Sequence, residues 1–262
     1  MKIGFIGCGN MGGALLKAAI AAGYRDEIWA SDRDASRAER FGVRASSNAE
    51  IAEGADYIFL GVKPQMLADL LAELKPVLAA RSSRFVLVSM AAGVPIARIC
   101  AELGAEYPVI RIMPNTPASV GEGMILYTAN GAVTDAETDA FRAVLAKAGR
   151  LDPLPEHLID AASAVSGCGP AYVYLFAEAM ADGGVECGLP RDKAALYAAQ
   201  TLLGAARLLL EGGHPGALKD AVCSPGGTTI AGVHALESGA FRADVMNAVT
   251  AAYEKTLTLR GK

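Results

Sequence analysis

Short apolar runs alternate with segments of helical length over residues 2–155, and this alternation restricts the possible folds more than any other feature. The runs read "KIGFIG", "EIWAS", "DYIFLGV", "RFVLVSM", "YPVIRIM" and "MILYT", several of them apolar throughout. Such runs are typical of parallel strands buried on both faces. Between them, residues 11–23, 48–55, 65–74 and 94–103 have helical length and period. Repeated strand–helix–strand units predict an α/β fold with a Rossmann-type, doubly wound parallel sheet.

The strand signal stops after residue 155. Residues 170–184, 190–213, 228–239 and 240–260 form long segments rich in alanine and leucine, and glycine ends several of them, as it ends helices. We therefore expect a dinucleotide-binding domain over residues 1–155 and an all-α domain over residues 156–262. Several of these helices are apolar over most of their circumference, which predicts a homodimer that buries the additional faces.

The composition narrows the class of partner. The 262 residues carry a net charge of −4, so no basic surface favours nucleic acid or an anionic membrane. A small-molecule substrate is the expected partner.

The cysteines form no CxxC pair and the three histidines lack ligand spacing, so we expect no metal site. The uncharged run at 161–177 contains a Gly-Pro break, which favours a buried helix over a membrane span. No secretory signal is visible, which predicts a cytoplasmic protein.

The first strand runs directly into a glycine-rich turn. "GFIGCGNMGG" places Gly7, Gly9 and Gly12 in the pattern G-x-G-x-x-G between a strand and a helix. In this context Gly7 allows the tight turn, Gly9 lets the backbone approach a pyrophosphate, and Gly12 lets helix and strand pack closely. The helix N-terminus also faces the anion. The turn predicts a bound dinucleotide.

The end of the second strand leaves the choice of dinucleotide open. Asp32 lies where an acidic side chain accepts hydrogen bonds from the ribose hydroxyls of NAD. Ser31 and Arg33 flank it, and a hydroxyl with a guanidinium suits the 2′-phosphate of NADP. Arg33 as a solvated loop charge remains the alternative. We expect NADP(H) as the preferred cofactor and NAD(H) as the alternative.

Two later loops follow strands of the same predicted sheet. "GVKP", at 61–64, and "SMAAG", at 89–93, lie at carboxyl ends of parallel strands, where ligands of open α/β sheets bind. Lys63 is the one cation there, and it is either a cofactor contact or a surface lysine before a turn. Asn48 is expected to cap the helix that follows the third strand and to touch the adenine end of the cofactor.

The stretch "CSPGGTTIAG", at 223–232, concentrates turn residues and hydroxyls at the start of a helix. The turn can direct consecutive amide N–H groups at a carboxylate, with the positive end of the helix dipole behind them. The alternative is an ordinary helix start, in which Ser224 or Thr228 caps the helix and the two glycines only form a turn.

Together these motifs resemble one family. "GFIGCGNMG", "GVKP", "MAAG", "MPNTPA", "SGCGPAYVYLFAEAM" and "KDAVCSPGGTTIAGVHALE", in this order and spacing, resemble pyrroline-5-carboxylate reductases over nearly the whole chain. The resemblance implies a Rossmann domain followed by an all-helical domain that interlocks two subunits. It also implies dimers that gather into a ring of five, and NADPH or NADH as the hydride donor.

The resemblance also implies individual contacts. The implied cofactor contacts are Ile6, Gly7, Cys8, Gly9, Asn10, Met11, Ser31, Asn48, Val62, Lys63, Pro64, Met90, Ala91 and Ala92. The implied substrate contacts are Ser224, Pro225, Gly226, Gly227, Thr228 and Thr229. Thr229, close to the helix start, is the candidate catalytic residue through a hydrogen bond to the ring nitrogen of a cyclic imine.

The implied activity is reduction of 1-pyrroline-5-carboxylate to L-proline, the last step of proline biosynthesis. Hydride transfer to an imine needs chiefly orientation, which fits the lack of a nucleophile motif. A β-hydroxyacid reductase of the same plan is the first alternative, but it commonly uses a lysine on the helix that here reads "PAYVYLFAEAM". Another imine reductase and a non-catalytic protein that senses NADP are the remaining alternatives.

Overall fold

The structure is a computed structural model that describes residues 1–260, with side chains to residue 258. Its contacts divide the chain into two units. The first contains residues 1–168 and the described residues from 252 onward, and the second contains residues 169–251. The domain boundary expected between residues 155 and 156 stays a prediction.

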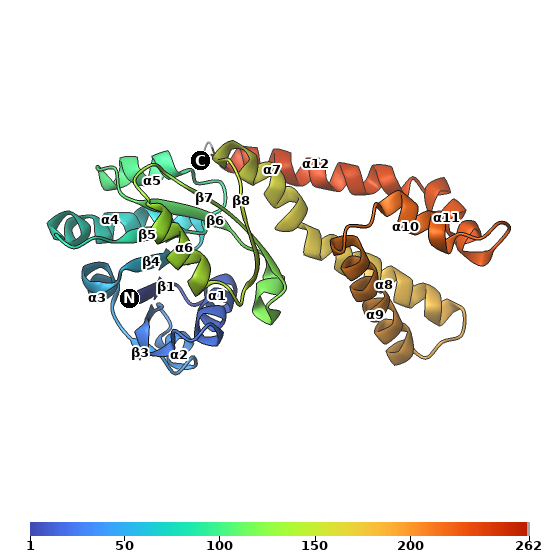
Figure 1. Ribbon diagram of the computed structural model, residues 1–262, viewed down its shortest axis with the longest axis horizontal. Coiled ribbons are helices and arrows are strands. Elements are labelled where there is room, and N and C mark those ends of the chain that lie inside the picture. Colours follow the sequence, from blue (N-terminus) through green and yellow to red (C-terminus); the bar gives the residue numbers. More distant parts are fainter. Residues whose placement is uncertain (261–262) are drawn as a thin grey trace. The chain divides into compact units, whose positions relative to one another are not determined.

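The first unit is built on one eight-stranded sheet (Figure 1). Its strands are β1 (Ile3–Ile6), β2 (Ile28–Ser31), β3 (Arg44–Ala45), β4 (Tyr57–Leu60), β5 (Val86–Ser89), β6 (Val109–Met113), β7 (Gly123–Ala129) and β8 (Gly149–Pro153). The order across the sheet is β3-β2-β1-β4-β5-β6-β7-β8. This order contains the 3-2-1-4-5-6 order of the Rossmann fold, so the predicted fold class is confirmed.

One pair of neighbours departs from the predicted parallel sheet. β6 and β7 are antiparallel, with Ile112 opposite Tyr127, whereas every other pair of neighbours is parallel. The connection between them, residues 114–122, contains only a short 3-10 helix, η2 (Thr116–Val120). A parallel crossover needs about a dozen residues or more, so this short connection returns the chain in the opposite direction.

Helices cover both faces of the sheet and form two cores. On one face, α1 (Asn10–Ala21) and α6 (Asp135–Val144) bury side chains against Phe5 and Phe59, whose rings stack 4.5 Å apart. On the other face lie α3 (Asn48–Gly54), α4 (Pro64–Ala80) and α5 (Ile96–Leu103). Figure 1 shows these helices flanking the strands, with α2 (Ala35–Glu39) near β3. β1, β2, β4, β5 and β6 are therefore buried on both sides, as their apolar runs predict.

A buried ion pair attaches α7 (Glu156–Ser166) to the sheet. Arg111 of β6 and Asp160 of α7 are both fully buried, and their Nη2 and Oδ1 atoms lie 2.6 Å apart. Glu156 lies 3.4 Å from Nη1 of the same arginine and also accepts the amide N–H of Ile96 at 2.8 Å. These bonds fix the first two turns of α7 against β6 and the start of α5.

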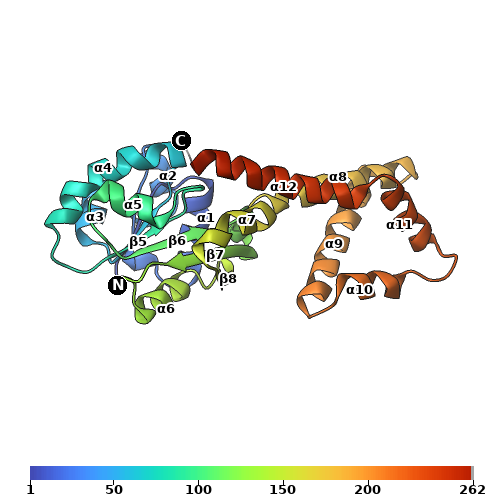
Figure 2. The same ribbon diagram turned by 90° about the horizontal axis from the view of Figure 1, so that it is seen from above.

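The second unit is entirely helical (Figure 2). It contains α8 (Gly169–Glu186), α9 (Arg191–Leu210), α10 (Pro215–Val222), α11 (Thr228–Ser238) and most of α12 (Phe241–Arg260). α8 and α9 pack on each other through small residues, Ala181, Ala194 and Ala198, which are the buried side chains described in this unit. The all-α prediction is confirmed. None of the helices within residues 1–260 has both the length and the apolar character needed to cross a bilayer.

Candidate functional site

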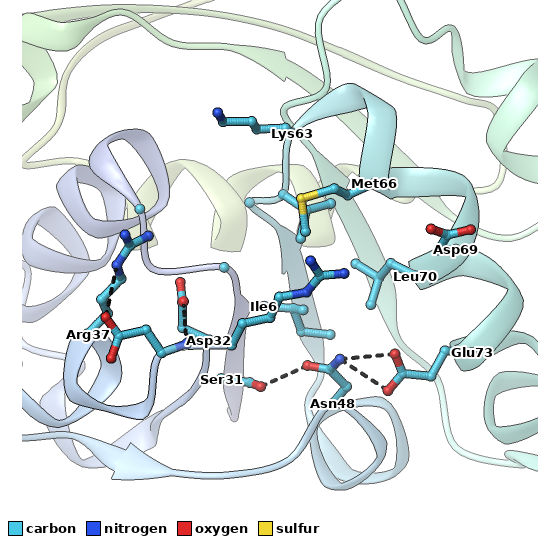
Figure 3. Close-up of a pocket in the computed structure, with 16 residues that line it drawn as sticks. Ile6, Ser31, Asp32, Arg37, Asn48, Lys63, Met66, Asp69, Leu70 and Glu73 are labelled. Atoms are coloured by element: carbon cyan, nitrogen blue, oxygen red, sulfur yellow. Dashed lines mark hydrogen bonds and ion pairs between the residues drawn. The ribbon is translucent and has the colours of Figure 1, made fainter.

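A cavity of about 400 Å³ lies at the carboxyl ends of β1 and β4, where the strand order reverses. Ligands of open α/β sheets bind at this position. The cavity is lined by the glycine turn after β1, the end of β2 and its loop, and the first turns of α3 and α4 (Figure 3). Its lining residues are Ile6, Gly7, Gly9, Ser31, Asp32, Arg33, Asp34, Arg37, Asn48, Gly61, Val62, Lys63, Met66, Asp69, Leu70 and Glu73.

The glycine turn could not be built from larger residues. Gly7 has a φ of +98°, and a Cβ there would lie 2.6 Å from the carbonyl oxygen of Gly61. A Cβ on Gly12 would lie 2.0 Å from the carbonyl oxygen of Gly7, so helix and strand approach closely only with glycine. Gly9, in contrast, faces open space, and a Cβ on it would have no other atom within 4 Å. The start of α1 is thus open to a ligand, and the first amide N–H groups of a helix lack intrahelical acceptors.

Asp32 and Arg40 hold the turn from its other side. The Asp32 carboxylate accepts the amide N–H of Cys8 at 2.7 Å and that of Asp34 at 3.0 Å. Arg40 donates to the carbonyl oxygen of Cys8 at 3.2 Å. The thiol of Cys8 is buried, and burial together with the Asp32 charge raises its pKa to about 11. Cys8 is therefore an unreactive part of the loop support, and both Asp32 oxygens already accept backbone donors.

Two arginines bring positive charge to the cavity. Arg33 and Arg37 both follow β2, and Arg37 lies 3.6 Å from the Asp34 carboxylate. Lys63 is the N-cap residue of α4, immediately before Pro64, and also lines the cavity (Figure 3). A guanidinium binds phosphate oxygens through paired donors, so this arrangement suits a phosphorylated ribose.

Three side chains from β2, α3 and α4 form a hydrogen-bonded chain at the cavity wall (Figure 3). Ser31 Oγ donates to Asn48 Oδ1 at 2.7 Å. Asn48 Nδ2 donates to both carboxylate oxygens of Glu73, at 3.1 Å and 3.2 Å. Asn48 is the first residue of α3, and the cap of that helix is Ser47, which forms a capping box with Glu50. The expectation that Asn48 caps α3 is thus wrong, because Ser47 caps this helix. The side-chain carboxamide of Asn48 lines the cavity instead.

The second unit contains the turn that precedes α11. The carbonyl oxygen of Ser224 accepts the amide N–H of Gly227 at 3.0 Å, and Gly226 between them has a φ of +68°. A left-handed residue at this place of a tight turn favours glycine. Gly227 has a φ of −78°, but a Cβ on it would lie 2.3 Å from Ser224 Oγ. Gly226 is therefore favoured by its backbone angle, whereas a side chain at Gly227 would require the Ser224 hydroxyl to move.

The start of α11 has no side-chain cap. Gly227 is the N-cap residue, and neither Ser224 nor Thr228 accepts a hydrogen bond from the first turn as a cap. The amides of Thr228 and Thr229 open the helix, and both threonines are exposed. This geometry argues against a cap by the Ser224 or Thr228 side chain and leaves amide donors beside two hydroxyls for an anionic ligand.

Comparison with known proteins decides the family. The family model described as "Pyrroline-5-carboxylate reductase dimerisation" matches residues 156–259, and one described as "NADP oxidoreductase coenzyme F420-dependent" matches residues 2–93. A pyrroline-5-carboxylate reductase of Escherichia coli is 44% identical to this chain, and the alignment covers 97% of each. The chain belongs to the pyrroline-5-carboxylate reductase family.

Solved structures of this family share the whole fold. A pyrroline carboxylate reductase of Plasmodium falciparum with NADP bound has a TM-score of 0.88 and 34% identity, covering 99% of this chain and 98% of the other. A pyrroline-5-carboxylate reductase of Coxiella burnetii has a TM-score of 0.90 and 34% identity, covering 98% of each. The predicted family resemblance is thus confirmed over nearly the whole chain.

The cavity gathers only some of the predicted cofactor contacts. Ile6, Gly7, Gly9, Ser31, Arg33, Asn48, Val62 and Lys63 line it. Asn10 and Met11 open α1 beyond its edge, and Pro64 begins α4 after Lys63. Met90, Ala91 and Ala92 follow β5 at the same end of the sheet without lining the cavity, and Ala91 is fully buried. The roles of all these residues stay predictions.

Sequence reasoning missed the wall that α4 contributes. Met66, Asp69, Leu70 and Glu73 occupy positions i, i+3, i+4 and i+7 of one helix and all line the cavity. That spacing places side chains on one face of a helix, and it was readable in the sequence. The sequence did not indicate that this face of α4 lies toward the end of β2. In the described part of the chain, no cluster of three or more His, Cys, Asp and Glu side chains could hold a metal ion.

Proposed function

We propose that the sheet-edge cavity binds NADPH and that the turn before α11 binds the carboxylate of 1-pyrroline-5-carboxylate. The protein is an NAD(P)H-dependent oxidoreductase that forms L-proline from this imine. The observation that carries this conclusion is the 44% identity to a pyrroline-5-carboxylate reductase over 97% of both chains. The glycine turn at the switch point of the sheet fits the cofactor independently, because its open Gly9 and crowded Gly12 suit a close pyrophosphate.

The residues of this chain serve mainly to bind and orient. The amides at the start of α1 hold the pyrophosphate, Arg33 and Arg37 hold the 2′-phosphate, and Val62 to Pro64 contact the rest of the cofactor. When bound, NADPH supplies a hydride to the carbon of the C=N bond, while the nitrogen carries the proton that it keeps in proline. Orientation of donor and acceptor then accounts for catalysis without a nucleophile.

In the substrate turn, the amides of Thr228 and Thr229 face the carboxylate, and the dipole of α11 stabilises its charge. The hydroxyl oxygen of Thr229 accepts one hydrogen bond from the protonated ring nitrogen. Ser224, Pro225, Gly226 and Gly227 shape the turn so that the planar ring can approach the backbone. A β-hydroxyacid reductase is disfavoured, since α8 reads "GPAYVYLFAEAMADGGVE" and contains no lysine to move an alcohol proton.

The test of this substrate turn is Thr229→Val. Loss of one hydrogen bond worth about 1.4 kcal/mol lowers kcat/KM for the imine about tenfold, while the Kd for NADPH and the melting temperature stay unchanged. Thr229→Ser restores most of the turnover. Thr201→Val, at an exposed residue of α9, is the matched control and leaves kcat/KM unchanged. Full turnover by Thr229→Val would remove Thr229 from the site.

We also propose the larger organisation of the protein. Residues 1–155 act as the cofactor domain and residues 156–262 as the substrate and dimerisation domain, which is supported by the dimerisation model over residues 156–259. The homodimers assemble further into a ring of five, and the enzyme works in the cytoplasm. Light scattering of the purified protein tests the ring, because the mass of ten chains differs clearly from that of two.

A further inference from the structure

We propose that Glu73 determines cofactor specificity by fixing the hydrogen-bonding direction of Ser31, an inference that rests on the proposed cofactor cavity. Glu73 is in α4 and not at the end of β2, which reads the ribose in Rossmann folds. Neither it nor α4 belongs to the glycine turn or to the loop after β2. Its hydrogen-bond effect reaches Ser31 through Asn48, while its carboxylate also lines the cavity (Figure 3).

The donor–acceptor direction of the Ser31–Asn48–Glu73 hydrogen bonds follows from the Glu73 carboxylate at one end. An ionised carboxylate only accepts hydrogen bonds, so the group of Asn48 that faces Glu73 must be its NH₂. Both Glu73 oxygens lie within 3.2 Å of Asn48 Nδ2, which holds the amide in this orientation. The carbonyl end of Asn48 then faces Ser31, and an oxygen that only accepts requires Ser31 to donate.

The single proton of the Ser31 hydroxyl is therefore already used. What Ser31 offers to the cavity is its lone pairs, which accept from a sugar hydroxyl. A 2′-phosphate dianion also presents acceptors only, so it gains no hydrogen bond from Ser31 in this arrangement. Ser31 thus favours the 2′-hydroxyl of NAD(H), in opposition to Arg33 and Arg37, which favour the 2′-phosphate of NADP(H).

The negative charge of Glu73 also disfavours the 2′-phosphate of NADP(H), but a control variant can separate this charge effect from the hydrogen-bond effect. Asp69 lies one turn earlier on the same face of α4 and lines the same cavity. No side-chain hydrogen bond is described for its carboxylate, so Asp69→Asn removes one negative charge and leaves the Ser31–Asn48–Glu73 chain intact. It is the matched control for Glu73→Gln, in which a carboxamide can donate to Asn48 and let the amide reverse.

The experiment measures the Kd of NADP⁺ and of NAD⁺ for the full-length protein by calorimetry, without substrate. Glu73→Gln is expected to raise the preference for NADP⁺ over NAD⁺ about tenfold, the effect of one hydrogen bond to a charged group. Asp69→Asn is expected to change that preference less than about threefold, as exposed charges do. Thermal unfolding of each variant checks that it is folded.

A double-mutant cycle shows whether Glu73 acts through Ser31. In a Ser31→Ala background the Ser31–Asn48–Glu73 chain has lost the hydroxyl that it orients. Glu73→Gln should then change the preference for NADP⁺ over NAD⁺ no more than Asp69→Asn does. An equal tenfold change in both backgrounds, or no larger change than that of Asp69→Asn, would overturn the inference. Wild-type protein that binds both dinucleotides but forms no proline would overturn the proposed function alone, and protein that binds neither would overturn the cofactor cavity together with this inference.

Discussion

At the residue scale, the charges at the end of β2 divide between support of the protein and recognition of the cofactor. Asp32 holds the backbone of the glycine turn through Cys8, so it is engaged within the protein rather than free to bind a ribose. Arg33 has no such partner among the hydrogen bonds and ion pairs described, and it lines the cavity beside Arg37. The side chain that follows Asp32 is therefore the better candidate to distinguish the two dinucleotides.

Arg33→Ala should weaken NADPH binding by about 1–3 kcal/mol, because a charge-assisted bond to the 2′-phosphate is lost. Binding of NADH, which lacks this phosphate, should change little. Calorimetry with each reduced cofactor measures both values. Arg150→Ala replaces an exposed arginine of β8 outside the cavity and serves as the control. Equal weakening of NADPH and NADH would show that Arg33 supports the loop and does not read the phosphate.

Single residues were predictable where one local property decides their role. Gly7 needs a positive φ and Gly12 needs close packing, and both requirements follow from a strand-to-helix turn. In the substrate turn the residue with a positive φ is Gly226, whereas at Gly227 a side chain would meet the Ser224 hydroxyl. Glu73 could not be predicted, because its contact with Asn48 depends on how α3 and α4 pack.

At the scale of elements, Glu137 joins the start of α6 to the segment before β5. It forms a capping box with Thr134 and accepts two hydrogen bonds from Arg84, at 2.7 Å and 2.9 Å. The Arg84 guanidinium, followed by the Thr134 amide and hydroxyl, lowers the pKa of Glu137 to about 2. A carboxylate with a lowered folded-state pKa stabilises the folded protein above its ordinary pKa of 4.5, and this contribution is lost as the pH falls from there toward 2.

Glu137→Gln should lower the free energy of unfolding at pH 7 by about 1 kcal/mol, the typical effect of a weakened cap. The difference from wild type should shrink below about pH 4, because the wild-type carboxylate then loses its charge. Urea unfolding at pH 7 and at successively lower pH measures the difference. Glu122→Gln, at an exposed residue outside any helix, should show no such convergence. If the difference in free energy of unfolding between wild type and Glu137→Gln is the same at every pH, the charge of Glu137 does not contribute to stability.

Elements were predictable in proportion to how apolar they are. The predicted strand runs contain β1, β2, β4, β5, β6 and most of β7, since each of these buries apolar side chains. β3 has two exposed residues and β8 reads "GRLDP", so neither carries an apolar signal. They exist because neighbouring strands offer them hydrogen-bonding partners. α6 was missed for its polar sequence, although the spacing of Thr134 and Glu137 is a capping signal.

At the scale of the whole molecule, the second unit exposes the apolar surface that a partner subunit would bury. Leu175 of α8 is 68% exposed, Leu210 of α9 is 74% exposed and Met246 of α12 is 70% exposed. The sequence predicted this, because several of these helices are apolar over most of their circumference. The match to a dimerisation family over residues 156–259 supports a homo-oligomer in which these faces are covered.

Leu175→Arg should weaken the dimer, because it places a charge on an apolar face that association removes from water. Size-exclusion chromatography with light scattering should show a shift toward smaller mass at low protein concentration. Val120→Arg is the matched control, since Val120 is 76% exposed in the first unit and should leave the mass unchanged. A stable, active monomer of the wild-type protein would contradict the predicted homodimer.

The most direct measurement supplies the purified protein with NADPH and 1-pyrroline-5-carboxylate, then quantifies oxidised cofactor and L-proline in the same reaction. We expect one molecule of proline for each NADPH oxidised throughout the reaction, and neither product without the protein. Absence of proline from a reaction of folded protein that binds NADPH would contradict the assignment of this chain as a pyrroline-5-carboxylate reductase.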